Sequence, residues 1–100
     1  MEFFEVIDRL KKIRTRKGLS ARELSLNINK NVTYINRLEH RKDFVPTITA
    51  INDIAEACDS SLEELFYYDI DSYKIDKEII EVLKNTPADK KKAMLELFKK

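Results

Sequence analysis

Short amphipathic stretches follow one another along almost the whole chain, and their spacing restricts the fold more than any other feature of the sequence. The first stretch contains Phe3, Val6, Ile7, Leu10 and Ile13, whose spacing places all five side chains on one face of a helix. Only one glycine and two prolines occur in 100 residues. Because both residue types interrupt helices, their scarcity indicates an all-α protein and disfavours all-β folds.

Residues suited to turns and caps mark the ends of these stretches. We expect the first helix over residues 2–16, and Gly18 follows where a left-handed residue would end it. Ser20 and Glu23 have the S-x-x-E spacing of a capping box, which predicts the start of a second helix.

A second turn and a third helix follow directly. Asn29 tolerates a left-handed conformation better than most residues, so the chain is expected to turn there. The third helix is predicted over residues 32–39, with Asn31 or the residue after it as its cap. Ile35 and Leu38 then face inward.

Two further helices are marked by their first residues. Pro46 and Thr47 are typical of the start of a fourth helix, and Ser61 with Glu64 has the spacing of a second capping box, which predicts a fifth. We expect the neighbouring carboxylates of Glu63 and Glu64 to lie on the surface of that helix.

The last third of the chain is predicted to be a separate unit. Residues 67–73 break the helical period and read as a connector. A sixth helix is expected around residues 75–83, and a seventh begins with Thr86 as cap and Pro87 in the first turn. These last two helices are expected to form a hairpin.

Charge is distributed unevenly although the net charge is only +1. Residues 1–48 hold 11 Lys and Arg against 6 Asp and Glu, whereas residues 49–100 hold 8 against 12. Local basic density decides whether a surface attracts a polyanion. The N-terminal half is therefore the candidate surface for nucleic acid.

Several classes of protein are disfavoured. No run approaches the roughly 20 apolar residues that cross a bilayer, and acids stand where a signal peptide carries basic residues, so we expect a soluble cytoplasmic protein with no membrane partner. Cys58 has no second cysteine and is expected in the core. His40, the only histidine, has no partner at a metal-ligand spacing. We expect no catalytic site, no metal and no cofactor.

The segment LSARELSLNINKNVTYINRLEH, residues 19–40, combines the second and third helices with a tight turn. It resembles the helix-turn-helix family of Cro and phage repressors, also called the XRE family, and the resemblance extends over roughly residues 5–66. The matching positions are Leu19, Ser20, Glu23, Leu24, Tyr34, Ile35, Arg37, Leu38 and Glu39. The resemblance implies a five-helix phage-repressor-like domain, which the predicted two-helix hairpin follows.

Three residues depart from the pattern of the family. Ser25 stands in place of the usual Ala and Asn29 in place of the turn Gly, and both are physically acceptable. Ala21 replaces a Gln that often contacts DNA, and a methyl group cannot make that bidentate contact. Sequence specificity is therefore expected chiefly from the third helix.

The resemblance implies that the third helix enters the major groove with its N-terminal residues on the base edges. The residues expected to face the bases are Asn31, Val32, Thr33, Asn36 and Arg37. Asn36 is suited to adenine and Arg37 to guanine or a phosphate, whereas Val32 or the Thr33 methyl group can contact a thymine methyl.

Flanking residues are candidates for contacts with the phosphates, and their alternative role is plain surface solubility. They are Lys17, Arg22, Lys30, Tyr34, His40, Arg41 and Lys42. The resemblance also implies an ion pair of structural importance between Arg14 and Glu39, which joins the first helix to the end of the third.

We therefore expect a DNA-binding domain over residues 1–68 and a helical extension over residues 69–100. The expected function is a transcriptional repressor that binds double-stranded DNA as a homodimer through this extension. The alternative for the last helices is that they pack within one monomer. Two alternatives remain open. One is an antitoxin whose acidic residues bind a partner toxin, and the other is a protein-interaction module that does not bind DNA.

Overall fold

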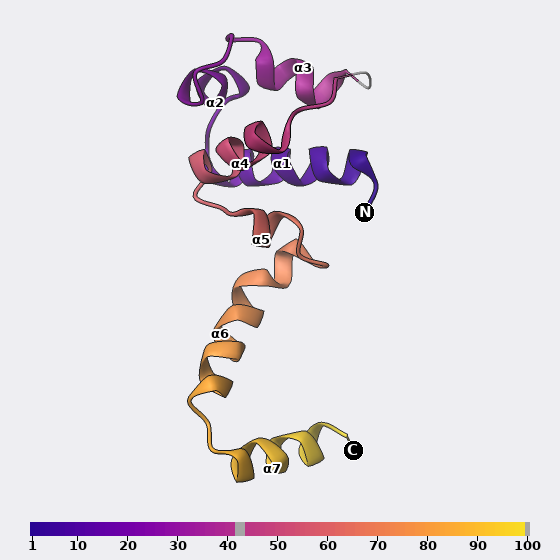
Figure 1. The fold of residues 1–100 in the computed structure, drawn as a ribbon, viewed down its shortest axis with the longest axis vertical. Coiled ribbons are helices and arrows are strands. Elements are labelled where there is room, and N and C mark those ends of the chain that lie inside the picture. Colours follow the sequence, from indigo (N-terminus) through magenta and orange to yellow (C-terminus); the bar gives the residue numbers. More distant parts are fainter. Residues whose placement is uncertain (42–43, 100) are drawn as a thin grey trace. The chain divides into compact units, whose positions relative to one another are not determined.

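A computed structural model, which describes residues 1–41 and 44–99, shows a helical chain in which these residues form no strand. The elements are α1 (Phe3–Lys17), α2 (Ala21–Asn27), α3 (Tyr34–His40), α4 (Ile48–Ala57), α5 (Leu62–Leu65), the short 3₁₀ helix η1 (Ile70–Ser72), α6 (Tyr73–Lys84) and α7 (Ala88–Phe98) (Figure 1). The expected all-α fold class is confirmed. Among the described residues no helix is long and apolar enough to cross a membrane.

The chain divides into two compact units, residues 1–70 and residues 71–100. The first unit has a core to which each of its five α-helices contributes. Ile13, Leu24, Ile35, Ile54 and Leu65 come from α1 to α5 in turn, and each is at most 1% exposed. Burying a side chain of this size stabilises a fold by about 1.5–3 kcal/mol. These contacts hold the short helices, which would be marginal in isolation.

Left-handed residues follow α1, α2 and α4 in the first unit. Gly18 has a φ of 81° and ends α1, where its backbone N–H donates to the carbonyl of Thr15. Asn29 has a φ of 60° in the turn between α2 and α3, so both predicted turns are confirmed. Asp59, with a φ of 54°, makes a similar turn after α4 that the sequence analysis missed.

The two predicted capping boxes differ. In the first, the Glu23 backbone N–H donates to Ser20 Oγ at 3.0 Å and the Ser20 N–H donates to Glu23 Oε1, so this box is confirmed. At α5, the Ser61 hydroxyl accepts from the Glu64 N–H at 3.1 Å. The Glu64 carboxylate, however, accepts hydrogen bonds from Arg16 at 2.8 and 3.2 Å and from the Ser60 hydroxyl at 2.6 Å.

The predicted surface position of Glu64 is therefore wrong, because the residue is only 2% exposed. Arg16, near the end of α1, compensates the buried charge with a bidentate ion pair. A carboxylate that leaves water in this way needs such a partner. Local spacing at α5 cannot indicate a cation that lies 48 residues away.

Helix α3 begins at Tyr34 rather than at residue 32 as predicted. The Asn31 side-chain oxygen accepts from the Thr33 backbone N–H at 3.0 Å and from the Thr33 hydroxyl at 2.8 Å. This local turn occupies residues 32 and 33, which the periodicity had assigned to the helix. Asn31 therefore caps the turn that leads into α3.

The second unit differs from expectation at both of its helix starts. The predicted connector is helical from Ile70 onward, and α6 begins at Tyr73. Thr86 does not cap α7, because its hydroxyl donates to the Val82 carbonyl at 2.6 Å, one turn back in α6. Pro87 occupies the cap position of α7, and no side chain caps that helix. Bonding of this kind is a common alternative for Thr at the end of a helix.

Neither α6 nor α7 contains a buried residue. Large apolar side chains on both helices are instead exposed, and Phe98 is the most open at 79%. They line a groove of about 390 Å³ within this unit. Its walls are formed by Ile75, Glu78, Ile79, Val82, Leu83, Met94 and Phe98.

Candidate nucleic-acid interface

Helices α2 and α3 are joined by a buried serine. Ser25 is 0% exposed, and its hydroxyl donates to the Ala21 carbonyl at 2.8 Å while it accepts from the Ile35 N–H at 3.0 Å. The second bond satisfies a donor in the first turn of α3, which has no partner within its own helix. The departure from Ala at this position thus adds a fixed link between the two helices.

An ion pair attaches α1 to the end of α3. Arg14 donates through Nε to Glu39 Oε2 at 2.7 Å and through its second terminal nitrogen to Oε1 at 2.9 Å. The side chains are only 12% and 4% exposed, respectively. Arg14 also donates to the Leu19 carbonyl at 2.9 Å. A single guanidinium therefore holds α1, the turn before α2 and α3 together.

With its inner side fixed, α3 presents a polar face. Ile35 and Leu38 are buried, whereas Thr33, Asn36, Arg37 and His40 are exposed. The positions of these four residues place them on the opposite side of the helix from the two buried residues. This outward face offers the amide, imidazole and guanidinium groups of α3 and the hydroxyl of its N-cap residue, Thr33.

The residues predicted to face bases have unequal surroundings. Asn31 is exposed, but its side-chain oxygen already accepts from Thr33, and Val32 is half-buried. Asn36 is exposed on α3. Arg37 is also exposed, and its Cζ lies 5.3 Å from the centroid of the Phe44 ring. Asn36 and Arg37 thus offer the most accessible polar groups of the set.

The predicted phosphate ligands are similarly varied. Lys17 forms an ion pair with Asp59 at the surface, and Lys30 Nζ lies 5.4 Å from the centroid of the Tyr34 ring. His40 Nδ1 donates to the Asn36 carbonyl at 2.8 Å, as expected for a residue in the last turn of a helix. Arg22 and Arg41 are exposed, and Lys42 lies outside the described residues.

Phe44 is a contact residue that the sequence analysis missed. Its ring meets Tyr34 edge to face, with 5.2 Å between centroids and an interplanar angle of 81°. Burial raises the pKa of Tyr34 above its ordinary value, and the nearby Arg37 charge opposes that shift. The one available signal was an isolated aromatic residue in the segment HRKDFVP, where the other side chains are largely charged.

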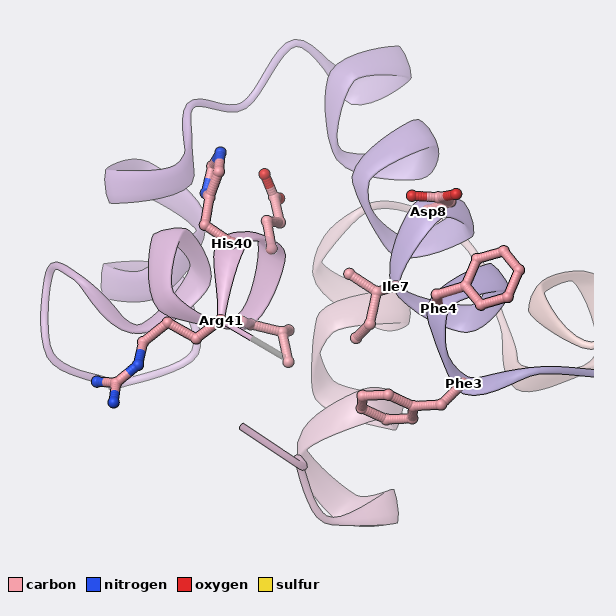
Figure 2. Close-up of a pocket in the computed structure, with 8 residues that line it drawn as sticks. Phe3, Phe4, Ile7, Asp8, His40 and Arg41 are labelled. Atoms are coloured by element: carbon pink, nitrogen blue, oxygen red, sulfur yellow. The ribbon is translucent and has the colours of Figure 1, made fainter. Parts of the chain in front are cut away.

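An apolar pocket of about 550 Å³ lies beside the end of α3 (Figure 2). Phe3, Phe4 and Ile7 of α1 line one side, and the end of α3 lines the other. Figure 2 shows the Arg41 guanidinium extending away from this pocket. The apolar hollow and the cationic end of α3 are therefore adjacent but face different ways.

Comparison with known families identifies the class of this fold. The helix-turn-helix family model matches residues 10–65, more than half of the chain. The chain therefore belongs to the helix-turn-helix family of the Cro/C1 (XRE) type, a family of DNA-binding regulators. Comparisons with curated proteins and with solved structures found no match.

Proposed function

We propose that this protein is a sequence-specific transcriptional repressor that inserts α3 into the major groove of a two-fold operator. The observation that carries the proposal is the exposed polar face of α3, which is fixed from behind by Ser25 and by the Arg14–Glu39 pair. A helix held in this way binds DNA without a large cost of ordering. The proposal assigns no catalytic activity to the chain.

Asn36 and Arg37 carry the proposed base recognition. An Asn side chain can bond adenine in bidentate fashion, and an Arg can bond guanine in the same way. Each good bidentate contact contributes about 1–3 kcal/mol of discrimination against the wrong base. The half-buried Val32 and the Thr33 methyl group are assigned apolar contacts with thymine.

Binding to a randomised duplex library at two salt concentrations tests this function. We expect the wild type to enrich a palindrome and the double variant Asn36→Ala/Arg37→Ala to lose it. Lys11→Ala/Asn52→Ala is a matched control, because it also removes one Asn and one cation but lies outside both α3 and residues 71–100. This control should enrich the same palindrome as the wild type. Weak binding without an enriched sequence would contradict the proposal.

The flanking cations are assigned to phosphates. Each phosphate contact releases counterions, so removing one should reduce the salt dependence by about one unit of slope without changing the enriched sequence. Arg22→Ala tests this, because Arg22 is exposed at the start of α2. A changed sequence preference in Arg22→Ala would argue that Arg22 reads bases instead.

We also propose that the protein binds its operator as a homodimer through residues 71–100. The exposed apolar side chains of α6 and α7 support this, because a second copy of the chain would cover them. Light scattering of the full chain should give twice the mass of the monomer.

The antitoxin alternative has weaker support. It relies on the acidic segment from Asp53 to Glu81 as a partner surface. Within that segment Glu64 is buried against Arg16, and Asp59 already pairs with Lys17. Co-purification of a basic protein from the native host, in stoichiometric amounts, would favour this alternative.

A further inference from the structure

Four side chains form a cation–aromatic cluster along one flank of α3. The Tyr34 and Phe44 rings meet edge to face, Lys30 Nζ lies 5.4 Å from the Tyr34 centroid, and Arg37 Cζ lies 5.3 Å from the Phe44 centroid. A cation within about 6 Å of a ring centroid is attracted by the electron-rich face of the ring. Each aromatic ring of the pair therefore has one cation beside it.

Phe44 is held by the core, whereas Arg37 is not. Phe44 is half-buried and packs with Tyr34 against the core of the first unit. Its backbone N–H donates to the Arg41 carbonyl, just beyond the end of α3. The ring is thus fixed at the level of α3, in a segment that is not part of the helix. It provides a rigid surface for a side chain that is otherwise exposed.

The aromatic ring leaves the charge of Arg37 available. In the described part of the chain, no carboxylate pairs with Arg37, in contrast to Arg14 and Arg16. An arginine that is held by a carboxylate must exchange that partner before it can bind another acceptor. A guanidinium held beside a ring keeps all its donors, and part of its rotamer entropy is already lost before it binds.

We infer that Phe44 is a positioning residue for DNA recognition, because its ring holds Arg37 on the outward face of α3. Phe44 itself does not contact a base in this arrangement. The inference rests on the proposed function, since it explains how Arg37 is positioned for the base contact that this function assigns to it. It also explains why a single aromatic residue lies among the charged residues that follow α3.

A double-mutant cycle on the enriched duplex tests the coupling. Phe44→Leu keeps an apolar side chain but removes the ring, and its affinity for the duplex should fall about 2- to 5-fold, the loss expected for one exposed cation–aromatic contact. In an Arg37→Ala background the same change should have no effect. Discrimination at the base pair that Arg37 reads should also weaken in Phe44→Leu and return in Phe44→Tyr.

Melting temperatures of all variants separate folding from recognition. Phe44→Met, whose flexible side chain fills similar space, is the second non-aromatic variant, so the cycle uses whichever melts closer to the wild type. An equal loss of affinity with and without Arg37 would overturn this inference alone. If the wild type enriches no duplex at all, the proposed function fails and this inference fails with it.

Discussion

Glu39 and Glu64 are two carboxylates with almost no exposed surface, and each depends on one arginine of α1. A buried pair of this kind contributes little net stability compared with an apolar substitute. Removing one partner is different, because the other charge stays behind without compensation. The cost of losing a partner is about 3–5 kcal/mol.

We therefore expect Glu39→Ala to lower the free energy of unfolding by about 3–5 kcal/mol, as measured by urea denaturation. Glu81→Ala is the matched control, because Glu81 also pairs with a cation but is 62% exposed. Exposed pairs rarely contribute measurably, so this control should unfold like the wild type. Equal midpoints for the two variants would show that Arg14 finds another acceptor or water.

Cys58 makes stability depend on pH in the alkaline range. Burial raises the pKa of its thiol above the ordinary value of 9.0, so above that pH the folded chain retains a proton that the unfolded chain releases. Stability contributed by the neutral thiol is therefore present below pH 9 and is lost as the pH rises toward the folded-state pKa.

Urea denaturation at several pH values tests this expectation. From about pH 9 upward, the free energy of unfolding should fall less steeply in Cys58→Ala than in the wild type, and the two curves should run parallel below that pH. Tyr34, whose pKa is also raised, adds a similar loss only above pH 10 in both proteins. Parallel curves throughout would contradict the assigned burial of the thiol.

At the scale of the element, the turn between α2 and α3 depends on one backbone angle, the φ of Asn29. Asn29 has a φ of 60°, a conformation that costs most residues about 1–2 kcal/mol and glycine almost nothing. Asn29→Ala should therefore lower the free energy of unfolding by about 1 kcal/mol, whereas Asn29→Gly should stay within about 0.5 kcal/mol of the wild type.

Thermal denaturation of these variants provides the measurement. Asn27→Ala is the control, because Asn27 is the exposed last residue of α2 and has a helical backbone, which alanine accepts readily. It should melt at or slightly above the temperature of the wild type. A turn that accepted Ala as readily as Gly would contradict the left-handed assignment.

Elements governed by local rules were predictable from the sequence. Gly18, Asn29 and the capping box of Ser20 and Glu23 are set by residues within one turn of each other, and all three are confirmed. Thr86 shows the weakness of such rules, since its hydroxyl could accept from a backbone N–H of α7 or donate to a carbonyl of α6, and it donates to the Val82 carbonyl. The residues predicted to contact DNA stay predictions.

Contacts between distant residues were not predictable from spacing. Nothing near Glu64 in the sequence indicates Arg16, which lies 48 residues away. Phe44 is close to Arg37 in the sequence, but it lies beyond the end of α3, so the helical period does not predict their contact. The Arg14–Glu39 pair was anticipated only through the family resemblance. Tertiary contacts therefore decide which of the charged residues that the sequence pattern places on the surface are in fact buried.

At the scale of the whole molecule, the core ends at Ile70. Every residue of the hydrophobic core cluster lies at or before that position, so a chain that ends there should fold without α6 and α7. We expect this shortened chain to melt close to the temperature of the full chain, to scatter light as a monomer and to bind a half-site with reduced affinity.

A chain that ends at Glu64 is the control for this experiment. It lacks Leu65, which is 0% exposed in the core, as well as Ile70, and it should show little helical circular dichroism. A shortened chain to Ile70 that still scatters light as a dimer would place the interface within the first unit instead.

The two arginines of α1 also affect the order in which the chain can fold. Arg14 and Arg16 emerge early during synthesis, but their partners lie 25 and 48 residues further along the chain. Until Glu64 leaves the ribosome, Arg16 lacks its carboxylate and α1 lacks the core contacts of α5. The first unit thus cannot complete its core until α5 has emerged, and a nascent chain halted before that point leaves the apolar face of α1 only partly covered.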